Sequence, residues 1–297
     1  MQKHTFSLLI VSKNRKLELE RTLLLLEKLI HFSEHEVLVF LDGCTDESEI
    51  LKEKFSEVQW YSTEKSIGAS AARNILYSKA SGQFLIGLDD DAHPLQTNFI
   101  GLTKTIFEKH PNVGIIAFKE IKGIFKSDAE ALCEATSPHQ EYLTNEFIGC
   151  GFAIRTDVYQ ATNGFPVWID IYGEESCVSV EVIAKGYDIL FTNSIQVNHR
   201  INVQERKLAG QNYFRFGKQL KNATYYYLVY YPFPLIPIVK LFVHNFRKYA
   251  LKDGNCFKIF FKTIFEIGGN AATILQYRNP VDKKVLYKMR KLKALRF

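Results

Sequence analysis

Cysteine is scarce in this sequence, and its few copies form no pattern. The five cysteines among 297 residues are scattered, and no two of them make a CxxC pair. An odd number of dispersed cysteines is atypical of a disulfide framework and favours reduced thiols in a cytoplasmic protein. None stands in a nucleophile pattern with a placed histidine, so we interpret Cys44, Cys150 and Cys177 as packing residues.

The sequence also lacks a long apolar leader, low-complexity segments and a repeat of fixed period. Residues 1–7 run directly into an apolar segment without a small-residue cleavage site, so we expect no signal peptide. A hydrophobic content of 46% and an aromatic content of 13% allow a sizeable core. The length suits one large domain, or one domain with an appendage.

Acidic residues are rare in the last third of the chain. Residues 201–297 hold 19 Lys and Arg but only 4 Asp and Glu, a net charge of +15. Residues 1–200 hold 19 basic and 28 acidic residues, a net charge of −9. This division predicts two roles, the second of which involves an anionic partner.

Strand-like and helix-like segments alternate along the first part of the chain. Short apolar runs predict strands at 6–12, 36–41, 58–61 and 84–88. Helices are expected at 16–30, at 47–55 and from 66–70 to about 82. This alternation predicts a parallel, doubly wound α/β sheet, in which loops 12–15, 42–46, 66–70 and 89–93 meet at one edge.

The pattern loosens after residue 118, and residues 120–147 carry no clear assignment. We expect helices at 96–109 and 176–185 and strands at 113–118, 148–154, 188–192 and 195–199.

Three consecutive carboxylates, Asp89, Asp90 and Asp91, follow the buried strand 84–88. Ligands of open α/β sheets bind at the carboxyl ends of strands. Asp89 and Asp91 are two residues apart and can turn toward one point, and their hard oxygens suit Mg²⁺ or Mn²⁺. Asp90 is then expected to point away. A solvated acidic turn that caps the next helix is the alternative.

An ordered series of motifs resembles the family 2 glycosyltransferases, which are inverting enzymes with the GT-A fold. The resemblance covers about residues 5–200. Its motifs are Ser7–Arg15, the acidic turn Leu41–Asp46 with Cys44 in place of the usual Ser, Gly68–Asn74, the Asp-x-Asp motif Leu88–Asp91, Gly149–Arg155, Gly164-Phe165, Gly173–Glu175 and His199.

The resemblance implies a Rossmann-like, mostly parallel sheet flanked by helices and followed by a helical, basic C-terminal extension. We expect a catalytic domain at 1–205, with a nucleotide-binding half at 1–118 and an acceptor half at 119–205. The extension is then 206–297.

The resemblance also implies roles for individual residues. Asp91, Asp89 and His199 would hold Mn²⁺ or Mg²⁺, and Glu175 would be the general base, in place of the family's usual Asp. Donor binding is expected of Asp42, Gly68, Arg73, Asp89 and Asp90, and acceptor binding of Trp168, Asp170 and Glu174. The alternatives are turn formation for Asp42, a surface salt bridge for Arg73, an ordinary strand end for His199, helix N-terminal stabilisation for both glutamates, and packing for Trp168.

Residues 225–243 form an apolar, tyrosine-rich run. Its length matches a bilayer, but Pro232, Pro234 and Pro237 would break a spanning helix, so we expect an interfacial or hairpin segment. Surrounding basic residues and the Phe- and Lys-containing stretch 257–265 favour contact with anionic lipid. Packing on the catalytic domain and binding of another polyanion are alternatives. Nucleic acid is disfavoured, because no binding motif accompanies the charge.

The expected function is inverting transfer of a sugar from a nucleoside-diphosphate-sugar, with UDP as the commonest guess, to a sugar or lipid-linked acceptor hydroxyl. Related bacterial enzymes build surface polysaccharide on lipid carriers, which implies a peripheral location on the cytoplasmic face of the membrane. A non-catalytic nucleotide-sugar-binding protein is the alternative. A nucleotidyltransferase ranks lower, because the loop 12–15 after the first strand has no glycine.

Overall fold

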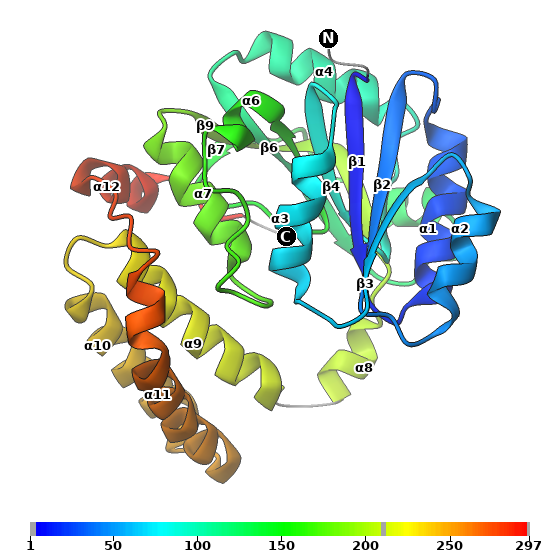
Figure 1. The fold of residues 1–297 in the computed structure, drawn as a ribbon. Helices are drawn as coiled ribbons and strands as arrows, with labels where there is room; N and C mark the ends of the chain where they lie inside the picture. The colour runs from blue at the N-terminus through cyan, green and yellow to red at the C-terminus, as the bar shows by residue number, and fades with distance from the viewer. Residues whose placement is uncertain (1–3, 209–211, 296–297) are drawn as a thin grey trace.

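A twisted sheet lies between two layers of helices (Figure 1). The computed structural model describes residues 4–208 and 212–295, and within them the sheet has nine strands in the order β3-β2-β1-β4-β8-β6-β9-β5, with β7 paired to β9. One face packs on α1, α2 and α4, and the other packs on α3, α6 and α7. Alternate side chains of one strand serve the two layers: Leu8 and Ile10 belong to the first core, and Leu9 belongs to the second.

The N-terminal half of the sheet is parallel, as the sequence predicts. Its strands are β1 (Phe6–Ser12), β2 (His35–Asp42), β3 (Gln59–Thr63) and β4 (Phe84–Asp89). They are joined by α1 (Lys16–Leu29), η1 (Glu47–Ile50) with α2 (Leu51–Lys54), and α3 (Ala69–Lys79). Because every strand pair in this half is parallel, the loops that follow β1, β2 and β4 lie at one edge of the sheet.

The second half of the sheet is mixed. It contains β5 (Ala92–Pro94), α4 (Phe99–Lys109), β6 (Val113–Lys122), α5 (Asp128–Glu134), β7 (Glu141–Thr144), β8 (Gly151–Arg155), α6 (Thr156–Gln160), α7 (Glu174–Ala184) and β9 (Asp188–His199). Strand β8 runs antiparallel to both β4 and β6, whereas β9 runs parallel to β6. The unassigned segment 120–147 thus supplies the end of β6, together with α5 and β7.

The two strands predicted at 188–192 and 195–199 form one continuous strand, β9. The polar residues Asn193 and Ser194 resemble a turn in the sequence. In the structure the ladder with β6 changes register here, since Phe118 pairs with Thr192 and Lys119 pairs with Gln196. The Asn193 side chain donates a hydrogen bond to the Pro138 carbonyl at 2.7 Å. The residues between the two registers therefore form a bulge in β9, and the strand continues through it.

The C-terminal region is helical, as predicted. It comprises α8 (Val203–Leu208), α9 (Tyr213–Tyr230), α10 (Leu235–Asn245), the π-helical turn η2 (Phe246–Ala250), α11 (Gly254–Leu275) and α12 (Lys283–Lys291). Helices α9 to α11 stand to one side of the sheet, and α12 returns to lie beside α7 (Figure 1). Pro232 and Pro234 separate α9 from α10, and Pro237 occupies the first turn of α10, where an N–H has no intrahelical partner. No described helix combines the length and apolar character required to cross a bilayer.

The tyrosine-rich start of the run 225–243 is buried. Tyr225, Val229 and Tyr230 of α9 are at most 3% exposed and form one apolar cluster with Ile169 and Cys177, which precede β9 in the chain. The helical region and residues 1–205 therefore share part of their core. The predicted division of the chain at residue 205 remains a prediction.

Gly87 of β4 offers a test of this packing. An added Cβ would lie 2.2 Å from Phe152 and 2.3 Å from the hydroxyl of Tyr77, both of which are core side chains. We expect Gly87→Ala to lower the free energy of unfolding by about 1–3 kcal/mol in urea titration. The matched change Gly101→Ala meets nothing within 4 Å on the exposed side of α4 and should raise stability slightly. Equal stability of the two variants would contradict this packing.

Candidate active site

The acidic turn after β4 is held by backbone hydrogen bonds to distant segments. The Arg200 amide donates to the Asp91 carbonyl at 2.9 Å, and the Thr22 hydroxyl donates to the Asp90 carbonyl at 2.7 Å. These contacts join the turn to α1 and to the end of β9. The backbone of the turn is therefore held in one conformation, and the side chains of Asp89, Asp90 and Asp91 leave it in different directions.

Asp90 faces the loop that leaves β1. Its Oδ2 accepts a hydrogen bond from the Ser12 hydroxyl at 2.7 Å, and its Oδ1 lies 3.3 Å from Nη1 of Arg15. Asp90 is 5% exposed. Burial raises the pKa of its carboxyl to about 7, although Arg15 opposes the change. The side chain thus faces Ser12 and Arg15, and the same guanidinium of Arg15 also contacts Asp91. That Asp90 points away from a ligand, and that it binds the donor, remain predictions.

Asp91 faces a histidine and an arginine. Its Oδ2 accepts from Nη2 of Arg15 at 2.6 Å, and its Oδ1 lies 3.2 Å from Nε2 of His199. Burial alone would raise the pKa of this carboxyl, but His199 and Arg15 outweigh burial and lower it well below its ordinary value. Asp91 is 1% exposed and remains a carboxylate near neutral pH.

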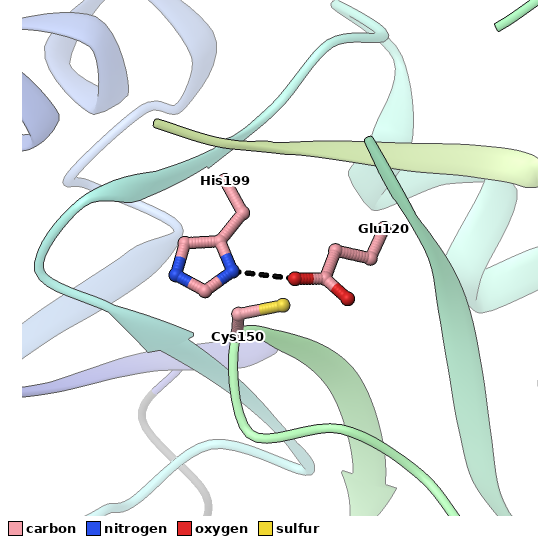
Figure 2. A group of neighbouring side chains, drawn as sticks. All are labelled: Glu120, Cys150 and His199. Atoms are coloured by element: carbon pink, nitrogen blue, oxygen red, sulfur yellow. Dashed lines mark hydrogen bonds and ion pairs between the residues drawn. The ribbon is translucent and has the colours of Figure 1, made fainter. Parts of the chain in front are cut away.

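His199 is oriented by Glu120 (Figure 2). Its Nδ1 lies 2.5 Å from Oε1 of Glu120, and the thiol of Cys150 lies beside both groups. Burial lowers the pKa of His199, but Asp91 and the groups on the Nδ1 side raise it to about 12. Burial raises the pKa of the Cys150 thiol to about 12, so this side chain is neutral.

The residues at the end of β4 fit a divalent cation. Ligand atoms of Asp89, Asp91 and His199 lie within 4.8 Å of one another. Oδ1 of Asp91 is buried without a hydrogen bond, although it faces Nε2 of His199. Two carboxylate oxygens and one imidazole nitrogen suit Mn²⁺ or Mg²⁺, with deprotonation of His199 on binding. With a cation bound there, Glu120 would be the outer carboxylate that orients His199.

A second set of carboxylates surrounds Arg73. Nη2 of Arg73 lies 2.7 Å from Asp89, and its Nη1 lies 2.9 Å from Glu174 and 3.8 Å from Glu175. Arg73 is 9% exposed, so it forms a buried ion cluster rather than a surface salt bridge. It joins the end of β4 to the first turn of α7.

Glu174 and Glu175 differ in access to solvent. The side chain of Glu174 is 3% exposed, whereas that of Glu175 is 22% exposed. Burial, followed by the negative charge of Glu174, raises the pKa of Glu175. An added Cβ at Gly149 would lie 2.6 Å from Oε1 of Glu175 and 2.9 Å from Arg73, which explains the glycine there. Of the two acids, Glu175 is therefore the one that a substrate can reach.

Asp42 organises the loop before α3. Its Oδ1 accepts from the Ile67 amide at 2.7 Å, and its Oδ2 accepts from the Ser66 hydroxyl at 2.6 Å and the Gly68 amide at 3.1 Å. Asp42 is 2% exposed. Gly68 has a φ of +91° and packs on Asp170, 3.0 Å from the position of an added Cβ. These contacts support the turn-forming interpretation, and donor binding by Asp42 and Gly68 remains a prediction.

The predicted acceptor loop is tied to α9. Asp170 forms an ion pair with Lys218, and Nδ2 of Asn222 donates to the carbonyls of Ile171 at 2.8 Å and Tyr172 at 2.9 Å. Tyr172 has a φ of 71°, an uncommon conformation for a residue with a side chain. Helix α9 thus fixes the backbone directly before Gly173 and the two glutamates.

Trp168 packs among aromatic rings. Its ring centre lies 6.5 Å from that of Tyr225, 6.3 Å from Tyr230 and 6.4 Å from Tyr277. It lines a pocket of about 520 Å³ that includes Asn74 but not Arg73, Asp89 or Glu175. The contacts support the packing interpretation, and acceptor binding by Trp168 remains a prediction.

Three residues of this region were missed by the sequence analysis. Arg15 lies in a loop that was expected at the site, so its position was the available signal. Glu120 falls in the unassigned segment, and Asn222 lies in the helical extension. Neither of these two carries a motif that would single it out.

The protein-family model described as "Glycosyl transferase family 2" matches residues 7–160. The chain belongs to glycosyl transferase family 2. An uncharacterised protein of Haemophilus influenzae is 32% identical over 181 residues, which cover 55% of this chain and 94% of that protein.

Solved structures share the fold of this family 2 chain. GalNAc-T7 with UDP, GalNAc and Mn²⁺ gives a TM-score of 0.61 at 18% identity, over 91% of this chain and 57% of that one. A Pyrobaculum calidifontis mannosyltransferase with GDP-Man and Mn²⁺ gives 0.57 at 14%, over 96% and 83%. TarS 1-349 of S. aureus gives 0.53 at 15%, over 66% and 60%. The present chain thus spans less than two thirds of TarS 1-349 and of GalNAc-T7.

Glu120 should control metal affinity through His199. We expect Glu120→Gln to weaken Mn²⁺ binding by about 10–100-fold. Loss of a carboxylate that orients a metal-binding histidine typically lowers metal affinity by about this factor. Calorimetric titration, or the electron paramagnetic resonance signal of free Mn²⁺, measures this without turnover. The control Glu53→Gln removes an exposed carboxylate of α2. Unchanged Mn²⁺ affinity in Glu120→Gln, or an equal loss in both variants, would contradict the role of Glu120.

Proposed function

We propose that this protein transfers a sugar from a nucleoside-diphosphate-sugar to an acceptor hydroxyl, with inversion at the anomeric carbon. The observation that carries the proposal is that a candidate cation site and a partly accessible carboxylate lie next to each other at the end of β4. A candidate cation site made by Asp89, Asp91 and His199 adjoins, through Asp89 and Arg73, a partly accessible carboxylate, Glu175.

The donor would bind at the candidate cation site. A divalent cation held by Asp91, Asp89 and His199 would supply positive charge beside the diphosphate. Arg15 lies next to Asp91 with 43% of its side chain exposed, so its guanidinium is available to a phosphate on the same side. Several structural neighbours were crystallised with UDP- or GDP-containing ligands, two of them with Mn²⁺. This supports a nucleotide-sugar and Mn²⁺ as the first pair to test.

Glu175 would act as the general base. Its carboxylate takes the proton of the acceptor hydroxyl while the acceptor oxygen bonds to the anomeric carbon. The bond from that carbon to the diphosphate oxygen breaks, and the nucleoside diphosphate leaves with the electron pair. Arg73 lies 3.8 Å from the Glu175 carboxylate. Burial and the negative charge of Glu174 raise the pKa of Glu175, and Arg73 lowers it.

The acceptor would approach the loop 165–173, where Asp170 and Trp168 lie. We place the reaction in surface polysaccharide or glycan synthesis, on a sugar or lipid-linked acceptor at the cytoplasmic face of a membrane. The basic, aromatic helical region supports peripheral attachment there.

A panel of nucleotide sugars, each with and without Mn²⁺, tests the proposal. We expect release of nucleoside diphosphate from at least one donor, with loss of turnover in the presence of EDTA. Binding of a donor without any release would indicate a nucleotide-sugar-binding protein instead. The absence of both binding and release across the panel would contradict the proposal.

Glu175→Gln separates binding from chemistry. The amide keeps the size of the side chain but cannot take a proton, so kcat should fall by about 100-fold or more. The Kd for the donor should stay within about threefold, because the diphosphate end of the site is unchanged. The control Glu108→Gln alters an exposed carboxylate of α4 and should leave both values unchanged. Full activity in Glu175→Gln would contradict the role of Glu175.

The pH dependence of kcat/KM tests whether the charge of Glu174 raises the pKa of Glu175. The base works as a carboxylate, so its raised pKa places the acidic limb of kcat/KM above the ordinary value for Glu of about 4.3. Glu174→Gln removes a negative charge that raises this pKa and should move the limb to lower pH. A limb that keeps its position in Glu174→Gln would show that another group controls it.

A further inference from the structure

Helix α10 exposes a row of aliphatic side chains. Leu235, Ile236, Val239 and Val243 are 73%, 65%, 59% and 44% exposed. Their spacing places them on one side of the helix, and Ile238 on another side is buried. Scattered exposed apolar residues are ordinary, but four neighbours on a single helix form a patch of the kind that contacts a partner or a membrane.

A basic hollow adjoins this row. It has a volume of about 590 Å³ and continues from α10 into η2 and the turn after it. It is lined by Val239, Lys240, Val243, His244, Arg247, Lys248 and Lys252, and none of these residues is acidic. The valines belong to both features, so cations and aliphatic side chains occupy one continuous surface.

The cations of this surface differ from those of α9. Lys218 and Lys221 of α9 form ion pairs with Asp170 and Glu266. Within residues 4–208 and 212–295, the lysines and arginine of the basic hollow form no ion pair with a carboxylate; Lys248 lies over the ring of Tyr249. Their charge is therefore available to an external anion.

We propose that this surface, from Leu235 to Lys252, docks on an anionic lipid bilayer; we call it the docking face. Lipid phosphates would occupy the basic hollow, and the aliphatic row would enter the boundary between headgroups and acyl chains. A bilayer supplies anionic and apolar surroundings at adjacent depths, whereas a nucleic acid would leave the aliphatic row in water. The inference deepens the proposed membrane attachment and does not depend on the transfer chemistry.

The dimensions of α10 agree with a helix that lies in the interface. Its 11 residues give a length of about 16 Å, well short of the roughly 30 Å hydrocarbon core. The opposite side of the region is covered, since α10 contacts α9 and α9 contacts the catalytic region. The side of α10 that faces away from α9 is therefore the side that would meet lipid.

Flotation of the full chain with vesicles tests the role of charge. The vesicles contain phosphatidylcholine with or without phosphatidylglycerol, and no donor or acceptor is added. We expect binding only with phosphatidylglycerol. The variant Lys240→Gln/Arg247→Gln/Lys248→Gln/Lys252→Gln should bind at least about 100-fold more weakly, because each cation near an anionic surface contributes about fivefold.

A matched control removes the same charge elsewhere. Lys28, Lys104, Lys109 and Lys185 are exposed on α1, at two positions of α4, and just after α7. Their joint change to Gln should keep binding within about threefold of the unchanged protein, because these charges lie beyond the range of direct contact. An equal loss in both quadruple variants would show a response to net charge alone and would overturn the docking face.

A second pair of variants tests the aliphatic row. Leu235→Ser/Ile236→Ser/Val239→Ser/Val243→Ser should reduce vesicle binding by at least about tenfold, because buried apolar area is lost. Leu17→Ser/Ile50→Ser/Ile124→Ser alters residues that are 77%, 53% and 64% exposed on the catalytic region and should change nothing. Circular dichroism checks that each variant is folded.

The same measurements define what overturns the inference. Vesicle binding that survives loss of the four cations, or of the aliphatic row, contradicts it. Tighter binding to a DNA or RNA duplex than to the vesicles, lost with the four cations, assigns the face to a nucleic acid instead. Donor turnover, measured separately on the same variants, reports on the proposed transfer and not on docking.

Discussion

The buried guanidinium of Arg73 is the group on which the candidate active site depends. A charge with 9% exposure needs partners, and Asp89 from β4 and Glu174 from α7 supply them. Removal of one partner from a buried ion pair typically costs about 3–5 kcal/mol, because the remaining charge stays buried. Arg73 therefore contacts Glu174, which lies 101 residues further along the chain, and it lies between Glu175 and Asp89 at the end of β4.

Much of the parallel half and the grouping of Asp89, Asp91 and His199 could be predicted. Apolar runs followed by polar turns identify strands whose carboxyl ends meet, and the order of the motifs identifies the family. The contact of Glu120 with His199 could not be predicted, because it depends on a register change between β6 and β9. That change occurs at polar residues that resemble a turn. Asn222 could not be predicted either, because its partners are two backbone carbonyls, which no side-chain pattern identifies.

The helical region has two different sides. Its inner side carries Tyr225 and Tyr230, which share a core with Ile169, and Lys218 and Lys221 of α9 form ion pairs. Its outer side leaves aliphatic and cationic side chains in water. The sequence shows only a continuous apolar and basic composition across both sides. The separation arises at Pro232 and Pro234, where the chain leaves α9 and turns into α10.

The hydrogen bonds from Asn222 give the helical region a further significance. Asn222 of α9 donates hydrogen bonds to the carbonyls of Ile171 and Tyr172, and α9 also contacts α10. A single helix therefore connects the outer surface of the helical region to the loop before Glu174. The contact of Asn222 with Tyr172 lies three residues before Glu175. A shortened protein that lacks α9 would lose the hydrogen bonds that hold the loop before Glu174, as well as its C-terminal helices. Helices that look like an appendage in the sequence are in this respect part of the framework that supports the candidate active site.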